Sequence, residues 1–164
     1  MTLPRRFRAA ALTLAGAAAL ASPALLAPAV AAPAGCLGDP SNTWLTVSIE
    51  GLRNGKGLVN VAVYPDDSRK FLAKGGTIKN NRFPASAPNM RACVFVPNTG
   101  VYAIAVYHDE DASRKLNRSG IGLPTEGYGF SNNPSTIAGL PSFRSVRLNV
   151  PKSGLTTHVK IKYP

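Results

Sequence analysis

The chain is poor in the residues that most often build metal and catalytic centres. It has two histidines and two cysteines among 164 residues. A zinc centre needs three or four protein ligands, so this set does not supply one if the cysteines are bridged. Ser131 lies in the run Gly-Phe-Ser-Asn and not in a G-x-S-x-G turn. That absence excludes a nucleophile of the α/β-hydrolase type.

Long apolar runs are also missing from most of the chain, and no segment has a sustained helical period. The exception is the N-terminus, where an Ala/Leu-rich stretch over residues 9–21 has the length of a signal-peptide core. It follows three basic residues, Arg5, Arg6 and Arg8. Residues 29–31 read Ala-Val-Ala, which predicts cleavage before Ala32.

These features predict an exported protein of the periplasm or cell exterior, with no transmembrane segment once the signal is removed. The expected parts are a signal peptide at residues 1–31, a linker at 32–42 and a domain at 43–164. An even cysteine count in an exported chain predicts a disulfide between Cys36 and Cys93. Because residues 33–36 read Pro-Ala-Gly-Cys, a lipid anchor at Cys36 is the alternative.

The charge is strongly one-sided, with 19 Lys and Arg against 8 Asp and Glu, a net charge of +11. Without the three N-terminal arginines the charge is still about +8. Such a surface favours anionic partners, so we expect an anionic envelope component or another secreted protein. The bases are scattered and not interleaved with stacking aromatics, which argues against nucleic acid.

Alternating apolar and polar residues predict an all-β domain of about seven short strands. Residues 43–52 and 58–64 flank Asn54-Gly55, a pair typical of tight turns, and so predict a β-hairpin. Residues 101–108 are the least polar and should lie in the middle of a sheet. The other strands are expected at residues 77–83, 90–96, 142–150 and 155–163. Turn-punctuated strands of this kind predict an antiparallel β-sandwich.

One long polar stretch, residues 107–133, interrupts this pattern and is where a function is expected, since loops of this length are uncommon in compact domains. Asp109, Asp111 and Ser113 place oxygen ligands at alternate positions, as in the first half of a calcium loop. Arg114 stands where such loops have a glycine. The alternative is that the two aspartates pair with nearby bases or accept hydrogen bonds from the loop's own amides.

The same stretch carries two other groups of candidate residues. His108, Asp109 and Glu126 could form the acid–base set of a hydrolase or isomerase. Alternatively, His108 hydrogen-bonds the backbone and Glu126 binds loop amides. Tyr128 and Phe130 alternate with glycines, so they could expose flat rings for a sugar or peptide, or Phe130 could plug the end of the sandwich.

The stretch also resembles a known family. The residues that carry the resemblance are Tyr102, Ala103, His108, Asp109, Gly122, Leu123, Pro124, Glu126, Gly127, Gly129, Phe130 and Ser131. In this combination they resemble domain of unknown function 2141, an uncharacterised family of secreted bacterial proteins. The resemblance implies an immunoglobulin-like or transthyretin-like β-sandwich with one long structured loop, and no established activity.

The sequence therefore predicts an exported, non-catalytic β-sandwich that acts as a binding or accessory domain. Its binding residues are expected among His108, Asp109, Glu126, Tyr128 and Phe130. No cofactor is expected, except in the alternative of a calcium-stabilised structural domain with Asp109, Asp111 and Ser113 as ligands. The remaining alternative is the hydrolase or isomerase.

Overall fold

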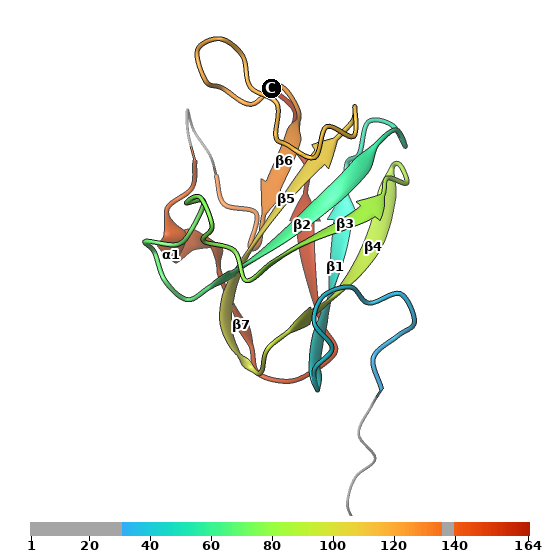
Figure 1. Ribbon diagram of the computed structural model, residues 1–164, viewed down its shortest axis with the longest axis vertical. Helices are drawn as coiled ribbons and strands as arrows, with labels where there is room; N and C mark the ends of the chain where they lie inside the picture. The colour runs from blue at the N-terminus through green and yellow to red at the C-terminus, as the bar shows by residue number, and fades with distance from the viewer. Residues whose placement is uncertain (1–30, 136–139) are drawn as a thin grey trace, which may run out of the picture.

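The computed structural model describes residues 31–135 and 140–164 (Figure 1). The predicted signal peptide therefore lies outside the described residues, apart from Ala31. This part of the chain is almost entirely β. The elements in chain order are β1 (Thr43–Glu50), β2 (Leu58–Pro65), β3 (Lys79–Pro84), β4 (Asn89–Val96), β5 (Gly100–Asp109), β6 (Gly127–Phe130), α1 (Phe143–Val146), β7 (Arg147–Val150) and β8 (Leu155–Lys160).

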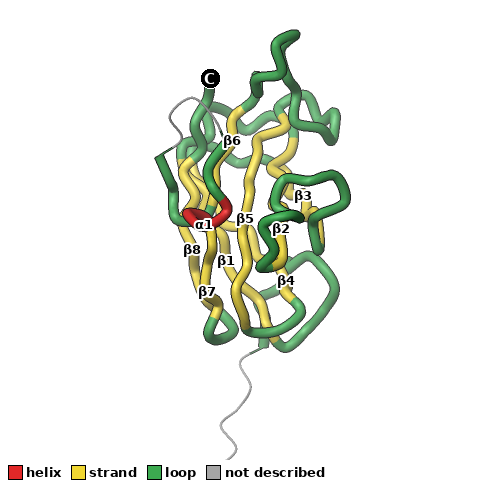
Figure 2. The backbone as a smooth tube through the Cα atoms, turned by 90° about the vertical axis from the view of Figure 1, so that its left-hand side faces the viewer, coloured by secondary structure: helices red, strands yellow, loops and turns green. Residues whose placement is uncertain are grey.

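The strands form two sheets packed against each other, which confirms the predicted all-β sandwich, with eight described strands instead of about seven. One sheet has the order β4-β1-β8. The other has the order β3-β2-β5-β6, and β7 pairs with the opposite end of β5 from β6 (Figure 2). Most pairs are antiparallel, but β1 and β8 run parallel.

The core between the sheets comes from the period-two alternation of the strands. Val59, Val61 and Val63 of β2 are fully buried and face Val47 and Ile49 of β1 across the core. Each fully buried aliphatic side chain of this size contributes about 1.5–3 kcal/mol of transfer free energy. The alternation read from the sequence thus identifies the inward face of each strand.

The predicted hairpin between β1 and β2 is wrong. β1 pairs with β4 and β8, whereas β2 pairs with β3 and β5, so the two strands lie in different sheets. Residues 51–57 cross from one sheet to the other, and Gly57 has φ +68° where its backbone lies against that of Asp109. Alternation fixes which face of a strand is buried, but it does not distinguish a partner beside the strand from one across the core.

β5 is central, as predicted, and one of its edges is shared by two short strands. β6 pairs with residues 105–108 of β5 and β7 with residues 100–103. The residue left between them is Ile104. The main chain of Ile104 is hydrogen-bonded by Ser131 instead. The Ser131 amide donates to the Ile104 carbonyl, and the Ser131 hydroxyl accepts from the Ile104 amide. With Ser131 in this position, the hydrogen bonding along this edge of β5 is continuous from β7 to β6.

The strand expected over residues 142–150 is interrupted. Residues 143–146 form the short helix α1, and only Arg147–Val150 pair with β5. α1 places Phe143 and Val146 in a second apolar cluster on the outer face of the larger sheet, with Phe71 and Phe130. Phe130 is buried there, so it covers the face of the sheet and not the end of the sandwich.

The structure contains the predicted Cys36–Cys93 disulfide, with 4.3 Å between the Cα atoms. Leu37 follows the bridge and pairs with β4, since its amide donates to the Cys93 carbonyl and its carbonyl accepts from Phe95. The expected linker is therefore tied to the domain from Cys36 onward. The described residues include no helix with the length and hydropathy needed to cross a bilayer.

Candidate functional site

The long loop joins two neighbouring strands at one end of the sandwich. β5 ends at Asp109 and β6 begins at Gly127, and the chain between them projects beyond the sheet near the C-terminus (Figure 1). Asp109 and Glu126 lie at the two ends of this loop, and both are buried. Buried carboxylates need hydrogen-bond donors, and the loop supplies them from its own backbone.

Asp109 organises the first turn of the loop. Its Oδ1 accepts from the amide of Ser113 at 2.9 Å, and its Oδ2 accepts from the amide of Arg114 at 2.7 Å. Arg114 has φ +63°, the left-handed conformation that a glycine would adopt at this point of a calcium loop. The loop therefore has that backbone shape at Arg114 without a glycine.

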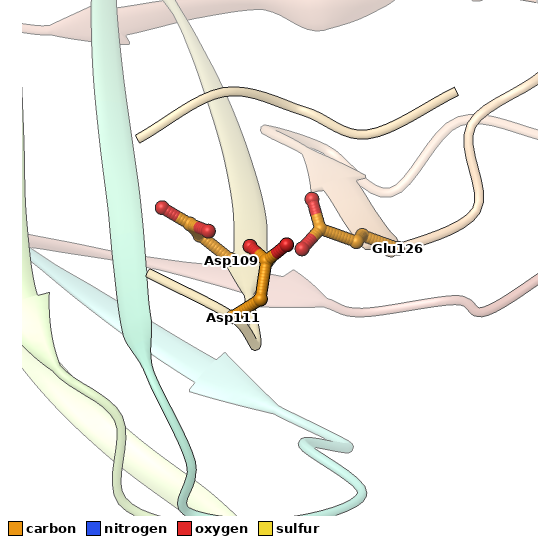
Figure 3. A group of neighbouring side chains, drawn as sticks. All are labelled: Asp109, Asp111 and Glu126. Carbon is orange, nitrogen blue, oxygen red and sulfur yellow. The ribbon is translucent and has the colours of Figure 1, made fainter. Parts of the chain in front are cut away.

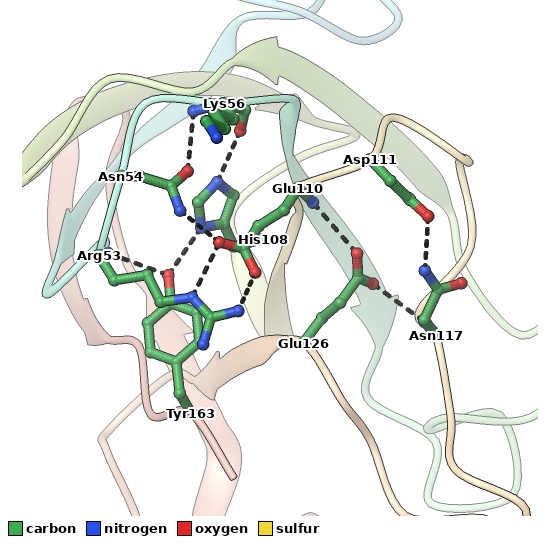
Figure 4. Close-up of polar contacts among 9 residues, drawn as sticks. All are labelled: Arg53, Asn54, Lys56, His108, Glu110, Asp111, Asn117, Glu126 and Tyr163. Carbon is green, nitrogen blue, oxygen red and sulfur yellow. Dashed lines mark hydrogen bonds and ion pairs between the residues drawn. The ribbon is translucent and has the colours of Figure 1, made fainter.

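Glu126 fastens the loop to the end of β5. Its carboxylate accepts from the amide of Glu110 at 3.1 Å and from the amide of Asn117 at 2.9 Å (Figure 4). Burial raises the pKa of the Glu126 carboxyl, although the two amide hydrogen bonds act in the opposite direction. The structure therefore gives Glu126 the amide-binding role that was one of its two predicted roles.

Asp111 completes a group of three carboxylates. Oxygens of Asp109, Asp111 and Glu126 lie within 4.8 Å of one another (Figure 3). Hydrogen bonds from Asn117 and Ser113 lower the pKa of Asp111 to about 2, so it is charged at neutral pH. In the part of the chain that the structure describes, no Lys or Arg forms an ion pair with any of the three.

Three more oxygen groups lie beside these carboxylates. The Ser113 hydroxyl is 3.3 Å from Asp109 Oδ1, 3.3 Å from the Lys115 carbonyl and 3.4 Å from Asn117 Oδ1. Calcium loops take ligands from positions 1, 3, 5, 7 through a backbone carbonyl, and 9. With Asp109 as position 1, the next four are Asp111, Ser113, Lys115 and Asn117, whereas position 12, where such loops have a bidentate glutamate, is Gly120. The donor set is therefore one of hard oxygens, as calcium prefers.

His108 does not join the carboxylates in an acid–base set. Its side chain is fully buried, and both ring nitrogens have partners. Nε2 lies 2.8 Å from the Lys56 carbonyl, an obligate acceptor, so Nε2 donates to it, and Nδ1 lies 2.6 Å from the Tyr163 hydroxyl (Figure 4). This is the structural alternative considered for His108, since the ring links the 51–57 connection to the C-terminal segment.

A neighbouring network escaped the sequence analysis. Glu110 accepts from the side chains of Arg53 and Asn54, and the Arg53 guanidinium lies 4.4 Å from the centre of the Tyr163 ring. Hydrogen bonding to Arg53 holds the pKa of Glu110 below its usual value. Asn54 was read only as a turn residue. No local signal links it to a carboxylate more than fifty residues later.

The glycines of β6 permit a close approach of the C-terminal segment. A methyl group on Gly127 would lie 2.4 Å from an atom of the Tyr163 ring, and one on Gly129 would lie 2.5 Å from the Lys160 carbonyl. The amide of Tyr128 donates to Lys162, and that of Lys162 donates to Tyr128, each at 2.9 Å. This contact holds β6 in place and turns Tyr128 and Phe130 to the outer face of the sheet.

That outer face carries a groove of about 210 Å³, which the sequence analysis did not find. Its floor is the small side chains of Ala62 and Ala105, which pair across β2 and β5. Aromatic rings and amides from four strands surround the floor, and the long loop closes one end. The lining residues are Asn60, Ala62, Tyr64, Leu72, Asn80, Ala105, Val106, Tyr107, Leu116, Arg118, Pro124, Tyr128, Phe130 and Leu140.

Asn60 is the most constrained polar group of this groove. It is 1% exposed, and its Nδ2 lies 3.4 Å from Asn80 Oδ1. Its Oδ1 has no hydrogen-bond partner among the described residues. Burial raises the pKa of both Tyr64 and Tyr107, so these hydroxyls remain neutral donors at physiological pH. The groove therefore combines flat apolar area with a few fixed polar groups.

The fold and the site define a small β-sandwich with an acidic loop that closes one end of an aromatic groove. The carboxylates of this loop accept hydrogen bonds from the loop's own amides. A family model described as an uncharacterized protein conserved in bacteria (DUF2141) matches residues 47–158. The chain belongs to this family, which confirms the resemblance seen in the sequence. Neither the curated proteins nor the solved structures gave a match to this chain.

Proposed function

We propose that this protein is an exported, non-catalytic binding domain whose ligand occupies the groove on the outer face of the β3-β2-β5-β6 sheet. The observation that carries the proposal is the composition of that groove. Ligand sites are concave and mostly apolar, with a small number of placed polar groups, and this groove has that character. At about 210 Å³ it suits a small molecule or one unit of a longer chain.

The engagement of the acid–base residues supports a non-catalytic role. Both His108 nitrogens are used, and Asp109 and Glu126 are committed to loop amides. A general base must reach the proton it abstracts, and these groups reach only the protein itself. The basic charge of the domain and the position of Arg118 in the groove favour a neutral or anionic envelope partner.

Amide NMR spectra of the mature protein, residues 32–164, would test this role. The probes would be a panel of small soluble compounds comprising sugars, amino acids and short peptides. We expect the perturbed amides to cluster at residues 60–64, 105–107 and 128–130. Perturbations confined to the opposite sheet, or none with any probe, would overturn the proposal. Export would be checked by N-terminal sequencing of the secreted product, which should begin at Ala32.

A second candidate role is calcium-dependent stabilisation through the loop. The observation that favours it is that Asp109, Asp111, Ser113 and Asn117, with the Lys115 carbonyl, bring oxygens together at alternate positions. Calcium bound only to the native state at a hundred times its Kd would stabilise the fold by about 2.7 kcal/mol. The exposed Arg114 and Lys115 side chains form no ion pair with the carboxylates among the described residues.

Thermal unfolding of chelator-treated protein, with and without added calcium, tests this role. We expect calcium to raise the Tm of the wild type and to leave Asp111→Asn much less affected. Glu50→Gln is the matched control, because Glu50 is an exposed acid at the end of β1 whose carboxylate pairs with His158 and is not one of the clustered loop carboxylates. A wild-type Tm that calcium does not change would rule out the calcium role. It would not affect the proposal that the groove binds a ligand.

A further inference from the structure

We propose that the groove binds a pyranose sugar ring. This inference rests on the binding role proposed above and names the chemical class of the ligand. A pyranose has one face rich in C–H groups and a rim of hydroxyls, each both donor and acceptor. The groove offers a matching pair of features, an aromatic and aliphatic platform and an amide whose oxygen lacks a partner.

The platform follows from the register of three strands. Ala62 of β2 lies opposite Ala105 of β5, and Ala105 lies opposite Phe130 of β6. Two residues along β5, and so on the same face, Tyr107 lies opposite Tyr128. Two small side chains in the middle of a sheet leave a depression that aromatic rings border. Aromatic faces carry partial negative charge and therefore attract the weakly positive C–H groups of a sugar ring.

The free amide oxygen distinguishes a sugar from a purely apolar ligand. Asn60 Oδ1 is buried, has no partner among the described residues, and belongs to a residue that lines the groove. This oxygen is already buried and unpaired in the free protein, so a ligand that donates a hydrogen bond to it removes an existing cost, whereas a hydrocarbon ligand does not. A hydroxyl of a sugar would donate to it, and Asn80 beside it would offer further amide groups to the next hydroxyl.

The charges around the groove restrict the class further. The lining residues include no carboxylate, and Arg118 is the one charged residue among them. Arg118 Nη1 donates to the Gly122 carbonyl at 2.8 Å, which leaves the rest of the guanidinium free to meet a ligand. A cationic ligand is therefore disfavoured. Neutral sugars fit, and a uronic acid would add an ion pair with Arg118.

A peptide fits this groove less well than a sugar. Peptides that bind sheets do so by adding a strand to a free edge, where main-chain groups are available. The floor here lies on β2 and β5, and both strands already have a partner on each side. A peptide lying over the floor would find side chains but no unpaired main-chain groups of these strands.

Titration calorimetry and saturation-transfer NMR on the mature protein would test the sugar assignment. The probes are glucose, N-acetylglucosamine and glucuronate with their short oligomers, and a mixed peptide pool as the contrasting class. We expect sugar binding that weakens at least about tenfold, or roughly 1.4 kcal/mol, in Tyr128→Ala and Asn60→Ala. Arg118→Gln should weaken glucuronate binding by a larger factor than glucose binding, because only glucuronate would lose an ion pair.

Two further variants keep the test independent of folding defects. Ala105→Leu fills the floor without removing any polar contact, so it should abolish sugar binding while the circular dichroism spectrum stays native. His158→Ala is the control, because His158 is exposed on the opposite sheet. It should bind as the wild type does.

The outcomes separate the ligand class from the site. Peptide binding that is blocked by Ala105→Leu, without sugar binding, would overturn the sugar assignment and keep the groove as the binding site. Sugar binding that survives Ala105→Leu would overturn the assignment of the sugar to this groove. If no sugar or peptide binds at millimolar concentration, both the assignment and the proposed function fall.

Discussion

Replacing Ser131 with alanine should destabilise the domain more than any other removal of a single hydroxyl that we consider. Ser131 is fully buried, and its hydroxyl accepts from the Ile104 amide at 3.1 Å and donates to the Val146 carbonyl. Ile104 is the residue of β5 that neither β6 nor β7 pairs with on that edge. Alanine would remove the partner of two buried main-chain groups at once.

The magnitude follows from those two groups. A buried donor or acceptor without a partner costs about 1–3 kcal/mol, so the loss for the two groups should be about 2–6 kcal/mol. For a domain of this size, 1 kcal/mol corresponds to a Tm shift of about 3–5 °C, so the Tm should fall by about 6 °C or more. A total stability of about 5–15 kcal/mol can absorb such a loss, so the variant should still fold.

Differential scanning calorimetry and urea unfolding of the oxidised mature domain would measure the effect. Ser86→Ala provides the matched control, since Ser86 is exposed in a loop, and its Tm should change by less than about 1 °C. A Tm for Ser131→Ala within about 2 °C of the wild type would refute the reasoning. It would mean that the Ile104 and Val146 groups find other partners, or water, without cost.

Three further predictions concern the disulfide, the glycines and the acidic loop. Cys36→Ser should lower the free energy of unfolding by about 3–4 kcal/mol in urea titrations, since the bridge closes a loop of 57 residues. A urea midpoint equal to that of the wild type would contradict this. Gly127→Ala should cost about 1–3 kcal/mol by steric overlap, whereas Gly120→Ala, where a methyl group meets nothing within 4 Å, should be neutral in the same titration. Asn117→Ala should raise the pKa of Asp111 from about 2 toward 3.8 in a carboxyl NMR titration. Because the folded pKa is depressed, the stability that Asp111 contributes is present above pH 3.8 and is lost as the pH falls toward 2, and the variant should lose that acid-range dependence.

The sequence was sufficient to identify seven of the eight described strands, at least in part, because burial follows a period of two. It missed β6, whose residues lie in the stretch expected to be a loop. Val59, Val61 and Val63 could not all face water, and the least polar strand had to be central. Which strands pair with each other was harder to predict from the sequence. β1 and β2 have the same alternation whether they lie side by side or face each other across the core, so the expected hairpin between them did not form.

The groove was hidden for a related reason. Asn60, Ala62 and Ala105 look like ordinary outward positions of their strands, and only the register of the sheet brings them together with Tyr128. By contrast, the acidic loop was visible because its ligand-type residues are close in sequence. What the sequence left open was whether those carboxylates bind bases or amides, and the structure shows amides.

The acidic loop and the groove are parts of one arrangement and should influence each other. Leu116 lines the groove and lies between Lys115 and Asn117, whose oxygens belong to the proposed calcium set. Any event that fixes the loop backbone, whether amide bonding to Glu126 or a bound cation, therefore also fixes one end of the groove. Coupling of this kind is reciprocal, because a ligand that favours the ordered loop must strengthen cation binding by the same factor as the cation strengthens ligand binding. In the function proposed above, the buried carboxylates at the two ends of the loop would position one wall of the groove, and this role needs no catalysis.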